Sequence, residues 1–81
     1  MTLFDILWSM ARTSTKQKLA KGVKYYRKAA GLSQEKLGLN SGLGRSYISG
    51  VERCERNPSL ESLEKIAKAL RVSVSDLTNP Q

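Results

Sequence analysis

The stretch QEKLGLNSGLGRSYISGVER, which runs from Gln34 to Arg53, predicts two short helices joined by one tight corner. Gly42 stands at the corner, where the chain must adopt a positive φ that is easy only for glycine. Leu37 is placed to anchor the first helix inward, and Gly38 beside it offers no side chain where the second helix must cross closely. These features indicate a compact pair of helices between residues 34 and 53.

The second helix of this pair separates an apolar face from a polar one. Ile48 and Val51, three positions apart, lie on its inward face. The outward face carries Arg45, Ser46 and Ser49. An exposed helix presented after a tight corner is suited to the major groove of double-stranded DNA. The pattern therefore predicts a helix-turn-helix whose partner is DNA.

The positive charge of the chain is concentrated in its first part. The net charge is +7, and the segment from Arg12 to Arg56 holds eleven lysines and arginines against three glutamates. Residues 57–81 are neutral, with three basic and three acidic side chains. A basic surface attracts nucleic acid, and a neutral remainder is suited to contact with a second subunit. The alternative is that the charge serves only solubility.

The chain lacks the residue types that many enzymes and metal sites require. It has no histidine and one cysteine, Cys54, so neither a Cys/His metal site nor an internal disulfide is expected. Most carboxylates fall on solvated helix faces, and no glycine-rich loop follows a strand. We therefore expect no enzyme activity, no cofactor and no metal, in a protein of the reducing cytoplasm.

Residues 1–14 form an apolar extension ahead of the domain expected at residues 15–78. The positions that would share one helical face are Leu3, Ile6, Leu7 and Met10. The run is too short to cross a bilayer and lacks the early positive charge of a signal peptide, so no membrane contact is expected. Three interpretations stay open: a small extra helix that packs on the domain, a flexible tail, or codons upstream of a true start at Met10.

Three further helices are expected around the pair. The first would begin at Ser14 or Thr15, either of which can cap free N–H groups, and it would end at a glycine, Gly31. Ser59 would cap a helix with an apolar stripe over residues 60–70, and a short last helix would begin near Ser73. The fold class is therefore all-α, with five helices.

Two segments resemble the Cro/CI-type helix-turn-helix family, also called the Xre family. They are LSQEKL at residues 32–37 and LESLEKIAKALRVSV at residues 60–74. The resemblance covers residues 19–77 and implies a five-helix, lambda-repressor-like DNA-binding domain. The chain departs from the family at Gly44, where a hydroxyl cap is usual, and at Arg71, where helix four usually ends in glycine.

A narrower resemblance lies in RSYISGVER at residues 45–53, followed by Arg56 and Asn57. This string is similar to the recognition segment of controller proteins of restriction-modification systems. The resemblance implies a dimeric, sequence-specific transcriptional regulator on a near-palindromic, inverted-repeat operator. Such regulators first activate and then repress their own gene and the endonuclease gene. The alternative function is an antitoxin that binds its own operator and also a toxin, a second protein partner held through the N-terminal extension.

The same segment predicts which side chains contact DNA. Arg45 lies at the exposed start of its helix, where a guanidinium can donate two hydrogen bonds to guanine; a phosphate contact is the alternative. Ser46 and Ser49 are short enough to let the helix lie deep, so both are candidates for base contacts. The residues expected at the DNA backbone are Gln34, Tyr47, Arg53, Arg56 and Asn57. For the last three the expectation follows the family, and for Tyr47 packing on the preceding helix is the alternative.

The resemblance also implies an ion pair. In the family, an arginine of helix one pairs with a glutamate near the end of helix three, and Arg27 and Glu52 occupy those positions. We expect a partly buried bidentate pair that fixes how the recognition helix projects. An unpaired, solvated arrangement is the alternative.

An apolar surplus at the neutral end of the chain predicts a homodimer. Its members are Leu70, Val72, Val74 and Leu77. Two-fold pairing through this surface would place two recognition helices one DNA turn apart, about 34 Å. The alternative is that these side chains only complete the core of one chain.

Overall fold

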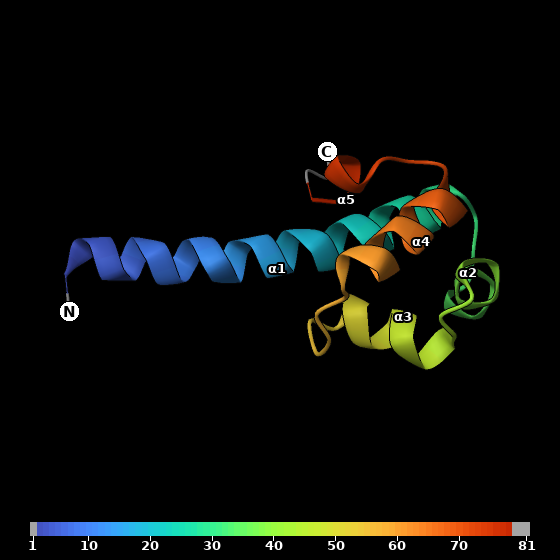
Figure 1. Cartoon of the computed structure of the whole chain (residues 1–81), viewed down its shortest axis with the longest axis horizontal. Helices are drawn as coiled ribbons and strands as arrows, with labels where there is room; N and C mark the ends of the chain where they lie inside the picture. The colour runs from blue at the N-terminus through green and yellow to red at the C-terminus, as the bar shows by residue number, and fades with distance from the viewer. Residues whose placement is uncertain (1, 79–81) are drawn as a thin grey trace.

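A computed structural model describes residues 2–78 of the chain, except for the side chains of residues 4–16. These residues form five helices and no strand: α1 (Leu3–Ala29), α2 (Gln34–Ser41), α3 (Arg45–Glu52), α4 (Leu60–Leu70) and α5 (Val74–Thr78). The expected all-α class with five helices is confirmed (Figure 1). Met1 of the predicted extension lies outside the described residues.

The first helix is longer than the sequence predicted. Its expected start at Ser14 or Thr15 is wrong, because α1 runs without interruption from Leu3 to Ala29. No proline occurs in this range, and the turns before Ser14 are themselves helical, so the backbone there is paired within the helix and needs no cap. The first half of α1 is therefore continuous with the helix of the domain and is not a separate small helix. It extends away from the other four helices, as Figure 1 shows.

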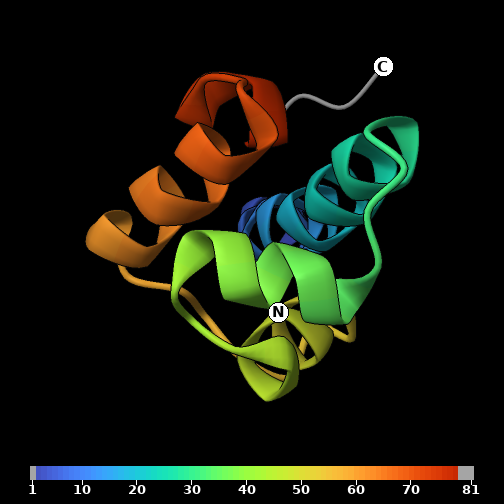
Figure 2. The same cartoon turned by 90° about the vertical axis from the view of Figure 1, so that its right-hand side faces the viewer.

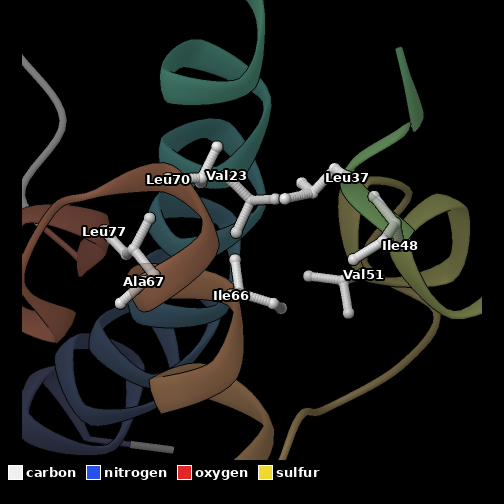
Figure 3. Packing of buried hydrophobic residues seen from close by; sticks show 8 residues of the cluster. All are labelled: Val23, Leu37, Ile48, Val51, Ile66, Ala67, Leu70 and Leu77. Carbon is white, nitrogen blue, oxygen red and sulfur yellow. The ribbon is translucent and has the colours of Figure 1, made fainter. Parts of the chain in front are cut away.

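The core lies where the second half of α1 meets the other helices, which gather around it in the view along α1 (Figure 2). Each helix supplies one side chain with no exposed surface: Val23, Leu37, Ile48, Ile66 and Leu77, in chain order. These side chains converge from all five helices in Figure 3. Because these side chains form one core, the inward face of α3 packs against residues from all four other helices.

The corner between α2 and α3 has the predicted geometry. Gly42 caps α2 with a φ of 77°, in the left-handed region, and its N–H donates to the carbonyl of Leu39. A Cβ added at Gly38 would lie 2.5 Å from the carbonyl carbon of Gly44, so the close crossing requires glycine. Gly44 precedes α3 without any side-chain cap, as expected from the missing hydroxyl.

A second close crossing joins α1 to α5. A Cβ added at Gly22 would lie 1.9 Å from the carbonyl oxygen of Leu77, closer than any real Cβ approaches an oxygen. The sequence alone suggests only that a glycine inside α1 is unfavourable. The structure gives the reason for it, since the absent side chain lets the backbone of α5 lie directly on α1.

The helix ends follow local rules. Ser33 and Ser59 cap α2 and α4 through their hydroxyl oxygens, which accept from the N–H groups of Lys36 and Ser62. Arg71 ends α4 with a φ of 60°, the left-handed conformation for which the related family uses glycine. A non-glycine residue is strained there, so this cap is weaker than it would be with glycine.

Candidate nucleic-acid interface

Helix α3, the predicted recognition helix, presents a polar face at the edge of the domain. Its apolar side chains are locked inside, Ile48 with no exposed surface and Val51 with 2%. Four residues of the opposite face line one open hollow: Arg45, Ser46, Ser49 and Arg53. The structure therefore brings the three predicted base-contacting residues together, with one predicted backbone contact beside them. All four are donors or acceptors of hydrogen bonds, as recognition of DNA requires.

An ion pair fixes the far end of α3 to α1. Arg27 donates from Nε to Oε2 of Glu52 over 2.6 Å and from Nη2 to Oε1 over 3.0 Å. Its Nη1 donates to the carbonyl of Leu32 over 2.8 Å. The side chains are 10% and 4% exposed, so the arrangement is the partly buried bidentate pair that the family resemblance implied. The hydrogen bonds from Arg27 to Glu52 raise the pKa of Arg27 above its usual value, so the guanidinium stays charged.

Gln34 belongs to the same network. Its side-chain Nε2 donates to Oε1 of Glu52 over 3.1 Å, which ties α2 to the pair between α1 and α3. The sequence placed Gln34 at the DNA backbone because it begins a helix, and it did not indicate this inward contact. The amide is thus turned toward Glu52 in the protein alone, while the residue remains half-exposed at the start of α2.

Tyr47 and Arg56 contact each other beside the hollow. The guanidinium carbon of Arg56 lies 5.0 Å from the centre of the Tyr47 ring, a cation–π arrangement. Tyr47 is half-buried and packs against the core, and its contact with the DNA backbone stays a prediction. Gly50 lies beneath this pair, where an added Cβ would meet the side chain of Arg56 at 3.5 Å, an ordinary contact. Asn57 is exposed in the loop between α3 and α4.

Arg53 has two partners in the protein itself. Its Nη1 donates to the hydroxyl of Ser49 over 2.7 Å. Its Nε and Nη2 both donate to Oε2 of Glu55, over 3.1 Å and 2.9 Å. The contact of Glu55 could not be predicted from the sequence, since two residues at a helix end have no fixed relation until the turn between them is known.

The predicted dimer surface divides into two parts. Leu77 has no exposed surface and Leu70 has 7%, because both belong to the core of a single chain. The expectation that they offer a free apolar surface is therefore wrong. Val72 and Val74 are only partly buried against that core, so they retain surface for a second subunit.

Within residues 2–78, leaving aside the side chains of 4–16, no group of three or more His, Cys, Asp or Glu side chains could hold a metal ion. Among the helices in this part of the chain, none combines the length and the apolar character needed to cross a membrane.

Comparison with known proteins places the chain in a family. The family model described as helix-turn-helix matches residues 23–77. Control protein C.SmaI from Serratia marcescens is 50% identical over 66 residues, which are 82% of this chain and 79% of that protein. The restriction-modification controller protein C.AhdI from Aeromonas hydrophila has a TM-score of 0.74 and 45% identity, over 76% of this chain and 94% of that chain.

A further similar structure includes DNA. The restriction-modification controller protein C.Esp1396I was solved as a tetramer in complex with its natural 35 base-pair operator. It has a TM-score of 0.73 and 40% identity, over 80% of this chain and 86% of that chain. The matching residues 23–77 contain α2, α3 and α4, most of α5 and the end of α1, which includes Arg27. The chain therefore belongs to the helix-turn-helix family of DNA-binding transcriptional regulators.

Proposed function

We propose that this protein is a cytoplasmic controller of restriction-modification genes, which binds a near-palindromic operator as a dimer. The observation that carries the proposal is the hollow on α3, where Arg45, Ser46, Ser49 and Arg53 lie together on a helix fixed from behind. Similarity to controller proteins over most of the chain supports the assignment to restriction-modification genes. The proposal includes no catalytic step and no cofactor.

Base reading is assigned to the exposed start of α3. Arg45 and Ser46 are exposed there, and Ser49 follows one turn later on the same face. A guanidinium in the major groove can donate to O6 and N7 of one guanine, which is worth about 1–3 kcal/mol of discrimination against other bases. Small hydroxyl residues beside it allow the helix to approach the base edges.

Contacts with the DNA backbone are assigned to residues that surround this face. They are Gln34, Tyr47, Arg53, Arg56 and Asn57. The start of α2 supports a phosphate contact at Gln34, because free backbone N–H groups and the helix dipole favour an anion there. In this assignment the backbone contacts set register and affinity, while the start of α3 sets sequence preference.

Dimer formation is assigned to the neutral C-terminal part of the chain. Val72 and Val74 are the members of the predicted surface that keep exposed area. A symmetric pair of subunits would present two α3 helices to successive turns of one DNA face. The operator would then be an inverted repeat.

Enrichment of random DNA on the purified protein tests the proposal. The expected result is a set of selected duplexes with two inverted half-sites, whose centres are about one helical turn apart. Each half-site should contain a guanine whose replacement weakens binding. Selection of single, non-repeated sites would contradict the dimer, and absence of any enriched sequence would contradict base reading.

A further inference from the structure

Glu55 lies against a cation of the proposed DNA surface. Its Oε2 accepts two hydrogen bonds from Arg53, at 2.9 Å and 3.1 Å, and Arg53 also donates to Ser49, which lines the hollow. Arg53 lines that hollow together with Arg45 and Ser46. The Glu55 carboxylate is therefore paired with the guanidinium of Arg53, the same group that contacts a DNA phosphate in the proposed function.

The backbone fixes this carboxylate next to Arg53. After α3 the chain reverses at Cys54, whose φ of 60° is left-handed. The N–H of Cys54 donates to the carbonyl of Val51 over 3.1 Å, and that of Glu55 donates to the carbonyl of Gly50 over 2.9 Å. This pair of bonds is the Schellman pattern of a helix end. Because the turn is closed twice, Glu55 is directed back along α3 and is not carried away by the loop.

We propose that Glu55 acts as an internal substitute for a DNA phosphate, which holds Arg53 in the free protein and lowers its affinity for DNA of any sequence. The inference rests on the proposed function, since it needs Arg53 to contact the DNA backbone. One carboxylate oxygen, Oε2, accepts from both Nε and Nη2 of Arg53, as one oxygen of a phosphate could. Binding of DNA then exchanges one anion for another at Arg53, with the Glu55 carboxylate released to solvent.

The exposure of the pair allows such an exchange. Both side chains are 61% exposed, so water and ions reach them. Exposed pairs of this kind are weak, and their loss changes an equilibrium by about five-fold or less. The pair of Arg53 with Glu55 can therefore separate when DNA binds, and the energy needed to separate it lowers the affinity for DNA by a measurable amount. The buried pair of Arg27 with Glu52, at 10% and 4% exposure, is unsuited to this role.

The exchange has a consequence for salt dependence. A free cation that contacts B-DNA releases condensed counterions and contributes about 0.9 to the slope of log affinity against log salt. A cation that first leaves a carboxylate contributes less, because the released carboxylate gathers a cation from solution. Removal of the Glu55 charge should therefore strengthen binding and also make it more sensitive to salt.

The test measures binding of a fluorescent duplex of random sequence over a series of salt concentrations. For each subunit that contacts the duplex, Glu55→Gln should tighten binding about three- to five-fold relative to the natural protein at low salt and steepen the slope by up to about 0.9. Glu61→Gln is the matched control, because Glu61 makes an exposed pair with Lys65 on α4 at 3.6 Å. It removes the same charge from another helix and should leave both quantities close to those of the natural protein.

A second background separates exchange at Arg53 from simple repulsion between Glu55 and DNA. In Arg53→Met, the further change Glu55→Gln should alter the affinity by less than about 1.5-fold, because the cation that it releases is gone. An equal gain of affinity in both backgrounds would overturn the inference, and so would no gain in the natural background. If the natural protein shows no salt-dependent affinity for any DNA, the proposed function fails and the inference fails with it.

Discussion

The segment from α2 to α3 and the segment from α4 to α5 both bury most of their apolar side chains, but they leave different surfaces exposed. On α3 the apolar face is consumed by the core, while Arg45 and Ser46 face solvent. On α4 and α5 the apolar residues that looked like a surplus are drawn inward, and Leu77 has no exposed surface. A short helix thus offers for binding only what its neighbours leave uncovered. In this protein the uncovered surface of α3 is polar, whereas the uncovered apolar surface of α5 is small.

The largest expected effect on stability comes from Leu77, the buried residue of α5. Leu77→Asp places a charge in the core without a partner, which should cost more than about 4 kcal/mol and leave the small domain mostly unfolded. Val74→Asp, on a partly buried residue of the same helix, should remain folded and weaken self-association. Circular dichroism and sedimentation of both variants test this difference. A folded, monomeric Leu77→Asp protein would show that Leu77 contributes to the dimer interface and not to the core of one chain.

The ion pair behind α3 gives the next largest effect. Glu52→Gln leaves the Arg27 guanidinium buried without an opposite charge, and it should lower the free energy of unfolding by about 3 kcal/mol. Glu61→Gln, which breaks an exposed pair, should change it by less than about 0.5 kcal/mol. Urea unfolding of both proteins measures the difference. Equal, small losses would mean that the Arg27–Glu52 pair contributes no more than a surface pair.

The crossing of α1 and α5 can be tested with two glycines of similar helical setting. Gly22→Ala brings a Cβ against the backbone of Leu77 and should cost about 2–3 kcal/mol, because α5 must move. Gly50→Ala meets only the flexible side chain of Arg56, so its stability should change by less than about 1 kcal/mol. Thermal unfolding decides between them. Equal tolerance of alanine would contradict the close contact of α5 with α1.

The smallest expected effect is a pH dependence at the start of α5. The N–H of Ser73 donates to Oδ2 of Asp76 over 2.9 Å, and the Ser73 hydroxyl accepts from the N–H of Asp76 over 3.0 Å. The backbone hydrogen bond lowers the pKa of Asp76 in the folded chain below its usual value of 3.8. Its contribution to stability is therefore complete above pH 3.8 and is lost as the pH falls through the lower folded value.

Asp76→Asn removes this ionisation. The urea midpoint of the natural protein should fall slightly more between pH 5 and pH 3 than that of the variant, since only the natural carboxylate becomes protonated. Because Asp76 is exposed, the difference should be small. A larger acid-induced loss in Asp76→Asn than in the natural protein would reverse the sign and contradict the capping role.

Sequence reasoning succeeded where a rule is local. Gly42 at the corner, Ser33 and Ser59 as caps, and the inward pair Ile48 and Val51 all follow from positions a few residues apart. The fold class followed from the same spacing. Family resemblance supplied the pairing of Arg27 with Glu52, which lie 25 positions apart and which local rules do not connect.

It failed where contacts between distant segments decide the outcome. The role of Gly22 depends on α5, which lies more than fifty positions later, and the burial of Leu77 depends on the same contact. The start of α1 was misjudged because two good capping residues occur inside a continuous helix. The partners of Gln34 and Arg53 were missed, since each side chain had a plausible role in DNA binding that concealed its contact within the protein.

The most direct test of the central claim, that the exposed start of α3 reads base sequence, is the ratio of affinities for the enriched operator and for random DNA in Arg45→Ala. The account predicts that this ratio falls by about ten-fold, because a bidentate contact with guanine is lost, while affinity for random DNA changes little. Lys65→Ala, which removes a positive charge on α4, should leave the ratio unchanged. An equal loss of affinity for both DNAs in Arg45→Ala would show that Arg45 contacts only phosphate and would contradict the account.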